Sequence, residues 1–485
     1  MLSEDILYSP VASLALKIRT QKISPVELTE SYLTRLEAIG PKLGALVTLM
    51  REQALEQARA AEKEIKSGRY RGPLHGIPFG VKDLLATKGI PTTWGAAPYK
   101  SQVFDYDATV VEKLRNAGAI LIAKLAMVEL AGGMGYNNPD ASFTGPGRTP
   151  WNTNFWSGGS SSGPGAATAA GLVAFSIGSE TSGSILTPSA CCGLSGLRPT
   201  YGLVSRHGAM ALCWSLDKLG PMCRTADDCG LVLAAIAGKD PQDPTSVSRK
   251  FDYPLNPAAG TDGTGRAGVT VSTATSKRRF KIGVIKDSTK DIQPEVKANF
   301  EQTIQVLQQY CDVTPDVVFP DFPWGNVVGT IVNAEGASAF FDLIESGKLA
   351  ELQTPRDRIG GYTASVVSAV DYLQAMRIRG PMQRAYQEFM TQFDAVIAPT
   401  RSAVAPPIGV DFDKAYPEVK GGTPLIPAGN AVGAPALCVP NGFGQNGLPT
   451  SIQFLGAPFS EKILVEIGNA FQARTPWHEK HPSIS

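Results

Sequence analysis

Residues 156–188 restrict the possible folds of this chain more than any other stretch. Two clusters rich in glycine and serine, residues 158–163 and 179–184, flank the small apolar run AATAAGLVAFSIG. Glycine permits strained turns and close approach of the backbone to a ligand, and the free N–H groups of such clusters suit an oxyanion hole. A flexible linker would not carry an apolar run that must be buried. The segment therefore predicts a tightly packed helix and then a strand over residues 163–178.

Apolar runs with strand character alternate with helical patterns along the rest of the chain. Ser24 and Pro25 are typical of a helix start, and Glu27 has the capping-box spacing. We expect helical structure over residues 25–66, with a second helical pattern beginning at residue 52, and a further helix over residues 294–310. Strands are expected at residues 73–85, 119–124, 281–285 and 393–399. This alternation indicates a layered α/β core.

Charge and composition argue against some classes of partner. The 485 residues contain 45 Lys plus Arg and 44 Asp plus Glu, so the net charge is +1. This balance offers no electrostatic attraction to nucleic acid or to an anionic membrane, and the basic cluster at residues 277–279 is interpreted as a solvated loop. The chain contains no run of about 18 uncharged apolar residues, and its N-terminus does not resemble a secretory signal. We therefore expect neither nucleic-acid nor membrane binding.

Cysteine, histidine and glycine usage argues against disulfides, metals and nucleotide cofactors. The seven cysteines include no C-x-x-C pair and lie in apolar surroundings, which favours buried free thiols in a cytoplasmic protein. The four histidines show no metal-ligand spacing. Residues 254–276 are rich in small and turn-forming residues and are expected to form a flexible loop. Their G-x-G-x-x-G match, Gly263 to Gly268, lacks a preceding strand and a following helix, so we expect no cofactor there.

A serine nucleophile needs a base, and the sequence offers three arrangements. A G-x-S-x-G pattern makes Ser161 a candidate nucleophile with His478 or His481 as base. The polar stretch before this pattern lacks the strand that the motif requires. Ser215 and Lys218 match S-x-x-K, but the S-D-N and K-T-G boxes of that class are missing.

Lys82 is the third candidate base. It lies in GIPFGVKDLL, an apolar stretch broken by turns, and unpaired lysines are rarely buried. Burial can lower the pKa of a lysine by up to about 3–5 units, which would supply a neutral amine near pH 7. From the residues alone, an ordinary ion pair between Lys82 and Asp83 is an equally good interpretation.

Several motifs in this order resemble the amidase signature family. They are GIPFGVKD (76–83), GGSSSGPGAATAAGL (158–172), IGSETSGSILTPSACCGLSGLRPTYGLVSRHG (177–208), LDKLGPMCRTADDC (216–229) and GNAVGAPALCVPNGFGQNGLPTSIQFLG (429–456). Ser184 follows Ser160 by 24 residues (184 − 160), as the family's nucleophile follows its bridging serine. The resemblance covers most of the chain and fades over about residues 240–390.

The resemblance implies a Ser–cisSer–Lys triad. Ser184 would be the nucleophile, Ser160 would bridge it to the base across a cis peptide bond, and Lys82 would be the neutral base. No metal ion or cofactor is implied. The other implied site residues are Met134, which would line the acyl pocket, and the backbone N–H groups of an oxyanion hole at Thr181, Ser182, Gly183 and Ser184.

The fold implied by the resemblance is a single α/β domain over residues 1–485. A mixed central β-sheet would be sandwiched by α-helices. The core would span about residues 60–235 and 390–460, and a variable region at about 310–395 would shape the substrate pocket.

Departures from the family pattern bear on the activity. The second cluster usually reads G-[ST]-D-[TI]-G-G-S-I-R, whereas here Glu180, Ser182 and Leu186 replace Asp, Gly and Arg. We interpret these departures as favouring a free-standing amidase, a monomer or homodimer acting on small-molecule amides, with esters or carbamates as further substrates of the same carbonyl geometry. Two alternatives stay open: an amidotransferase-type subunit that passes ammonia to a partner protein, and a non-catalytic binding protein of the same fold.

Overall fold

The computed structural model describes residues 2–253 and 279–484. The expected flexible loop at residues 254–276, with its glycine pattern, lies outside the described residues. Of the basic cluster, only Arg279 is described, and its exposed guanidinium forms an ion pair with Asp312 at 2.6 Å.

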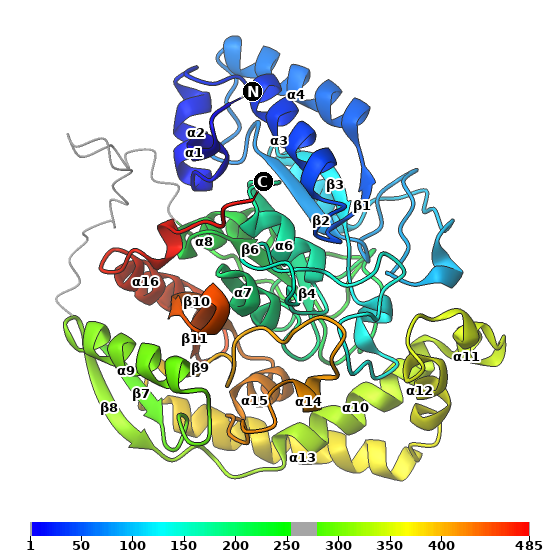
Figure 1. Ribbon diagram of the computed structural model, residues 1–485, viewed down its shortest axis with the longest axis vertical. Coiled ribbons are helices and arrows are strands. Elements are labelled where there is room, and N and C mark those ends of the chain that lie inside the picture. Colours follow the sequence, from blue (N-terminus) through cyan, green and yellow to red (C-terminus); the bar gives the residue numbers. More distant parts are fainter. Residues whose placement is uncertain (1, 254–278, 485) are drawn as a thin grey trace.

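A mixed sheet forms the centre of the molecule (Figure 1). In the described part of the chain it has 11 strands, in the order β1-β3-β2-β4-β6-β5-β10-β11-β9-β7-β8. Strand β2 runs parallel to β3 and β4, and β7 runs parallel to β8 and β9, while the other neighbours are antiparallel. The strands are β1 (Leu46–Leu49), β2 (Pro78–Lys82), β3 (Ile120–Leu125), β4 (Phe175–Glu180), β5 (Ser195–Arg198), β6 (Lys218–Cys223), β7 (Phe280–Ile285), β8 (Cys311–Val317), β9 (Ala395–Pro399), β10 (Ala436–Phe443) and β11 (Pro449–Leu455).

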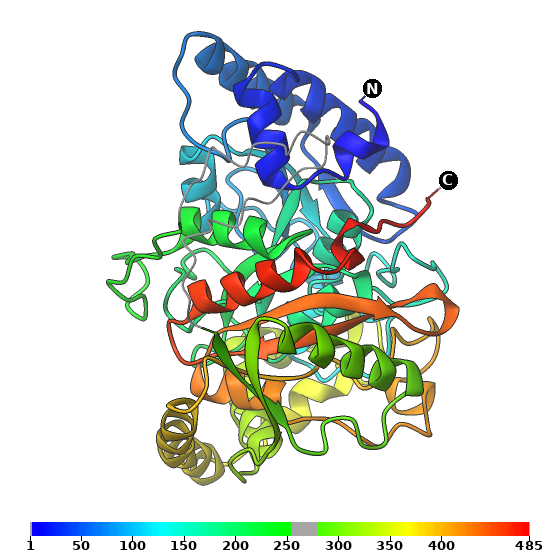
Figure 2. The same cartoon turned by 90° about the vertical axis from the view of Figure 1, so that its left-hand side faces the viewer.

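Helices pack around this sheet, with α3 and α4 at one end of the molecule and α10 to α13 at the other (Figures 1 and 2). The α-helices are α1 (Glu4–Leu7), α2 (Val11–Arg19), α3 (Pro25–Ile39), α4 (Arg51–Lys66), α5 (Thr109–Asn116), α6 (Ser162–Ala169), α7 (Leu186–Cys192), α8 (Ala226–Ile236), α9 (Pro294–Gln308), α10 (Trp324–Ala339), α11 (Phe341–Glu345), α12 (Asp357–Ala364), α13 (Ala369–Met390), α14 (Phe412–Ala415), α15 (Leu425–Val432) and α16 (Glu461–Gln472). Short 3₁₀ helices are η1 (Ala97–Tyr99), η2 (Glu129–Gly132), η3 (Lys348–Glu351), η4 (Gln445–Gly447) and η5 (Trp477–Glu479). This mixed sheet with helices packed around it confirms the predicted fold class.

Most expected elements are present, including the second helical pattern from residue 52 as α4, but the expectation of helix throughout residues 25–66 was wrong. Helix α3 begins as predicted, because the Ser24 hydroxyl accepts hydrogen bonds from the N–H groups of Val26 and Glu27. It ends at Ile39, and the proline at position 41 has no N–H with which to continue the helical hydrogen bonds. Strand β1 then pairs antiparallel with β3 before α4 begins.

The buried thiols predicted from the sequence are confirmed, since all seven cysteines are buried and free. Within residues 2–253 and 279–484, none of the helices combines the length and the apolar character needed to cross a membrane.

The arrangement of three central strands creates the candidate site. Strands β2 and β4 are parallel neighbours, so Lys82 and Glu180, their last residues, lie at the same edge of the sheet. Helix α6 begins in the first Gly/Ser cluster, and α7 begins just after the second. The two clusters therefore meet where β2 and β4 end.

Candidate active site

Lys82 lies at the centre of the candidate site. Its side chain is fully buried, and its Nζ donates hydrogen bonds to Ser160 Oγ at 2.7 Å and Ser179 Oγ at 2.9 Å. The two serines come from the first and second Gly/Ser clusters. The structure thus brings together residues 78 and 97 positions apart in the chain.

The electrostatics around Lys82 favour a neutral amine. Burial lowers the pKa of Lys82 to about 7, against the opposing influence of the Asp217 and Glu180 carboxylates. The ordinary ion pair with Asp83 is wrong, because the Asp83 carboxylate instead pairs with Lys124 Nζ at 3.1 Å. Among residues 2–253 and 279–484, no carboxylate therefore forms a close ion pair with Lys82 that would hold its proton.

The backbone of Ser160 has two distinctive features, one in the peptide bond before it and one at its carbonyl group. The Gly159–Ser160 peptide bond is cis, as the family resemblance implied. The Ser160 carbonyl accepts a hydrogen bond from the Val128 N–H at 3.1 Å. This contact links the first cluster to the segment that contains η2.

Ser184 lies on the loop between β4 and α7 and is 9% exposed, so it is accessible from one side. The loop is anchored by Glu180, whose Oε2 accepts the N–H groups of Ile185 at 2.9 Å and Leu186 at 3.1 Å. The two clusters also touch directly, because the Ser161 N–H donates to the Ser184 carbonyl at 3.3 Å. The candidate nucleophile is therefore on a fixed loop beside the cis serine.

The N–H groups of residues 181–184 differ from those that follow. Within residues 2–253 and 279–484, these four N–H groups donate no hydrogen bond to another protein group. The next two N–H groups, by contrast, donate to the Glu180 carboxylate. Unpaired backbone donors at a reactive serine are the arrangement that stabilises a developing oxyanion. The conformation is supported by Gly183, whose φ of 94° is unfavourable for other residues.

A cleft of about 230 Å³ opens next to this loop. Ser179 and Thr181 line it, as does Trp214, which is 46% exposed. Much of the remaining lining is apolar, with Leu84, Ala131, Ala209, Met210, Leu212 and Leu219. The cleft gives a small organic molecule access to the ends of β2 and β4.

Two neighbouring residues were missed by the sequence argument. Ser179 accepts the second hydrogen bond of Lys82, and its place inside the second cluster was the available signal. Asp217 accepts a hydrogen bond from Thr181 Oγ1 at 2.5 Å and from two backbone N–H groups, so it orients the start of the loop. No sequence pattern distinguished Asp217, because its partners come from separate segments.

Met134 is buried, at 2% exposure, and packs against the glycines of α12 rather than lining the cleft just described. Its expected role in the acyl pocket stays a prediction.

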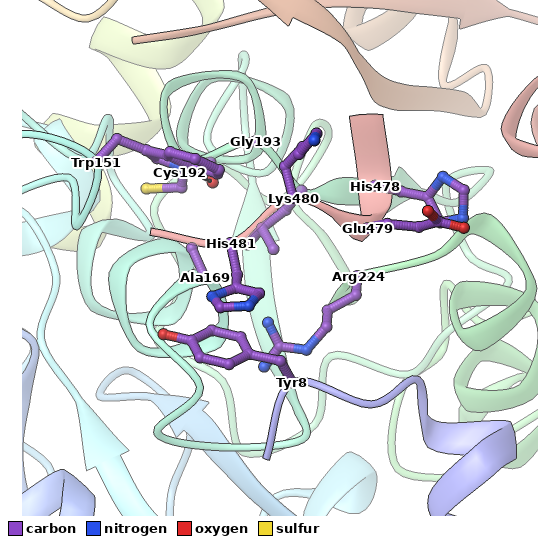
Figure 3. Close-up of a pocket in the computed structure, with 11 residues that line it drawn as sticks. Tyr8, Trp151, Ala169, Cys192, Gly193, Arg224, His478, Glu479, Lys480 and His481 are labelled. Carbon is purple, nitrogen blue, oxygen red and sulfur yellow. Dashed lines mark hydrogen bonds between the residues drawn. The ribbon is translucent and has the colours of Figure 1, made fainter. Parts of the chain in front are cut away.

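The alternative with Ser161 and a histidine is wrong. The Ser161 hydroxyl donates to the Ser179 carbonyl at 3.2 Å and is buried against β4. His478 and His481 line a different small cavity, where His481 stacks on Tyr8 at 4.1 Å between ring centroids (Figure 3). Among the described residues, neither histidine is hydrogen bonded to Ser161.

The S-x-x-K alternative is also wrong. Ser215 Oγ donates to Glu335 Oε1 at 2.8 Å, while Lys218 Nζ donates to the Leu216 carbonyl. The two side chains have separate partners, so Lys218 is not placed as a base for Ser215.

Comparison with known proteins agrees with this geometry. The family model described as Amidase matches residues 27–465. A glutamyl-tRNA(Gln) amidotransferase subunit of Dehalococcoides mccartyi is 34% identical, with 99% of this chain and 100% of the relative covered. Such curated relatives support the alternative of an amidotransferase-type protein more directly than the free-standing amidase that the departures in the second cluster predicted.

Solved structures include both kinds of protein. Peptide amidase from Stenotrophomonas maltophilia has a TM-score of 0.82 at 29% identity, over 96% of this chain and 97% of that one. The corresponding glutamyl-tRNA(Gln) amidotransferase subunit of Thermotoga maritima has a TM-score of 0.76 at 28% identity, over 98% and 97% of the two chains. With a family match across nearly its whole length, the chain belongs to the amidase signature family.

Proposed function

We propose that this protein hydrolyses carboxylic amides through an acyl-enzyme on Ser184. The observation that carries the proposal is the buried Lys82 amine, held by Ser160 and Ser179 at the edge of a small-molecule cleft. A serine nucleophile is weak until a base accepts its proton, and a lysine can do so only when neutral. The low pKa of Lys82 meets this condition near pH 7.

The proton would move through Ser160. As the Ser184 oxygen attacks the amide carbonyl, its proton passes to Ser160, whose own proton passes to Lys82. The N–H groups of residues 181–184 would hold the resulting oxyanion. The relay then returns a proton to the leaving amine, the C–N bond breaks, and Ser184 carries the acyl group until water, activated by the same relay, releases the acid.

Serine-directed labelling tests the proposed nucleophile. A fluorophosphonate probe, followed by peptide mapping, is expected to modify Ser184. The neighbouring Ser161 is the internal control, because its hydroxyl is committed to β4. Modification of Ser161 instead of Ser184 would contradict the proposal.

The substrate class requires a separate measurement. Amides, esters and carbamates present the same carbonyl to the triad, so the geometry alone does not rank them. The largely apolar cleft supports substrates with an apolar group beside the carbonyl. A panel of amides, anilides, esters and carbamates assayed with purified protein would rank them by kcat/KM.

A second candidate function is that of an ammonia-delivering amidotransferase component. It is favoured by the curated relatives, which are 34% and 36% identical over nearly the whole chain and carry the name of a glutamyl-tRNA(Gln) amidotransferase subunit. The same triad would then hydrolyse glutamine and pass ammonia to a partner. The purified chain alone, assayed with glutamine and with a simple aryl amide, separates the two: turnover of the aryl amide without glutaminase activity favours the free-standing amidase.

A further inference from the structure

Two buried carboxyl groups face each other beside the candidate site. Glu129 belongs to η2 and Asp357 begins α12, and both side chains are 1% exposed. The Glu129 oxygens accept the Gln353 N–H at 3.0 and 3.1 Å. Asp357 Oδ2 accepts the Thr354 hydroxyl at 2.6 Å.

These contacts leave one oxygen without a donor. Asp357 Oδ1 is buried and accepts no hydrogen bond from the described residues, and the Glu129 and Asp357 carboxyls lie within hydrogen-bonding reach of each other. Neither carboxyl forms an ion pair with a lysine, arginine or histidine in the described ranges. Two carboxylates cannot both be ionised at such a separation in a buried site, so the pair holds one proton between them.

The pair joins α12 to the η2 segment, and the η2 segment borders the cleft. On one side, the residue before Glu129 binds the carbonyl of Ser160, and Ala131 two residues later lines the cleft. On the other side, α12 packs against Met134 through Gly360 and Gly361. The contact between the carboxyls therefore connects α12, part of the expected variable region, to the backbone that holds the cis serine.

We propose that Glu129 and Asp357 are positioning residues that share one proton, and that this proton keeps α12 packed against the η2 segment and so maintains the shape of the substrate cleft. Glu129 donates the shared proton and Asp357 accepts it. Loss of the proton would place two negative charges together, and α12 would separate from η2.

The charged groups around the pair are few. Arg356 stabilises the Asp357 carboxylate through space, and the charges of Arg401 and Asp357 act in opposite directions on the pKa of the Tyr136 hydroxyl, which burial raises. None of these groups supplies a hydrogen-bond donor to Asp357 Oδ1 among the residues described. The shared proton is therefore the one donor available to that oxygen in the described chain.

The direction of the pH effect follows from this arrangement. Burial and the hydrogen bond to Asp357 raise the pKa of Glu129 to about 8. The pair thus keeps its proton at neutral pH and loses it as the pH rises through about 8. A group with a raised pKa in the folded state contributes stability at low pH and loses it as the pH rises, so the cleft should loosen on the alkaline side.

Measuring KM and kcat against pH tests the proposal, and this test rests on the proposed hydrolysis. In the wild type we expect KM to increase above about pH 8 while kcat is retained, because Lys82 stays neutral there. Asp357→Asn and Glu129→Gln replace the shared proton with a permanent amide donor, so both variants should lose this alkaline increase in KM. Glu351→Gln, an exposed carboxyl in the neighbouring η3, is the matched control and should keep it.

Hydrogen exchange tests the proposal without activity. The Gln353 N–H, bound to Glu129, should lose protection above about pH 8 in the wild type after correction for the intrinsic exchange rate. It should keep its protection in Asp357→Asn. Protection and KM that do not change between pH 7 and pH 9 in the wild type would overturn the positioning role. Normal exchange behaviour with no hydrolysis of any substrate would instead count against the proposed function.

Discussion

At the scale of single residues, the surroundings of Lys82 determine the protonation state of its amine. An exposed lysine would be almost fully protonated at pH 7, because its pKa is about 10.4. Here the amine is surrounded by strand residues and serine hydroxyls, and burial lowers its pKa to about 7. A common side chain is thereby suited to the proposed role of base without any histidine.

Replacing Lys82 with arginine should nearly abolish hydrolysis. A guanidinium stays charged at any working pH and cannot accept the Ser160 proton, so we expect kcat to fall by about 10²–10⁴-fold. In the wild type, kcat should rise with pH through about 7 as Lys82 loses its proton. The measurement is kcat against pH, with circular dichroism to check folding and the exposed Lys88→Arg as control. A folded Lys82→Arg enzyme with near-wild-type kcat would remove Lys82 from the mechanism.

Ser184→Ala and Ser161→Ala form a matched pair in the two clusters. Ser184→Ala should reduce kcat by about 10⁴-fold or more, since no other hydroxyl attacks the carbonyl. Ser161→Ala should keep most activity and lose about 1 kcal/mol of stability, because it removes a buried hydrogen bond to Ser179. Kinetics and denaturant unfolding of both variants check this, and equal losses of kcat would argue against Ser184 as the nucleophile.

At the scale of elements, the β4–α7 loop depends on one buried carboxylate. Glu180 binds two N–H groups of the loop, pairs with the buried Arg198 at 2.8 Å, and accepts the Asn430 amide at 2.9 Å. Although burial opposes it, Arg198 and the Asn430 amide lower the pKa of Glu180 to about 2. The glutamate in place of the family's aspartate thus ties the loop to β5 and α15.

Glu180→Ala should therefore destabilise the fold strongly. It leaves the Arg198 guanidinium buried without its partner, which costs about 3–5 kcal/mol of unfolding free energy. Urea unfolding at pH 7 measures the loss, and Glu466→Ala on the exposed side of α16 should change stability by less than about 0.5 kcal/mol. A loss no larger than that of the control would show that the loop does not depend on this ion pair.

At the scale of the whole molecule, the sheet brings the site together from distant segments. The last residues of β2 and β4 share one edge, the η2 segment borders the cleft beside them, and α12 packs against Met134, which follows η2 in the chain. Across residues 2–253 and 279–484, His, Cys, Asp and Glu side chains do not gather in groups of three able to hold a metal ion. The proposed relay through Ser160 also needs no Lewis acid.

Activity should therefore survive removal of metals. Prolonged treatment with EDTA followed by buffer exchange is expected to leave kcat/KM unchanged, because proton transfer and oxyanion binding are both assigned to protein groups. Assays before and after treatment, with metal analysis of the sample, check this. Full inactivation reversed by a divalent ion would contradict the lysine relay.

The sequence by itself predicted a strand around Lys82, a helix and then a strand over residues 163–178, and the two Gly/Ser clusters, because burial patterns and glycine positions are local properties. The spacing of Ser160 and Ser184 came from the resemblance to the family. The sequence alone misjudged residues 25–66, where strand β1 is selected by pairing with β3 rather than by local propensity. Only the tertiary structure decided that Asp83 pairs with Lys124, that Ser179 shares the Lys82 amine, and that Glu129 meets Asp357. These contacts join residues from separate segments, and their pKa values depend on burial that exists only after the chain has folded.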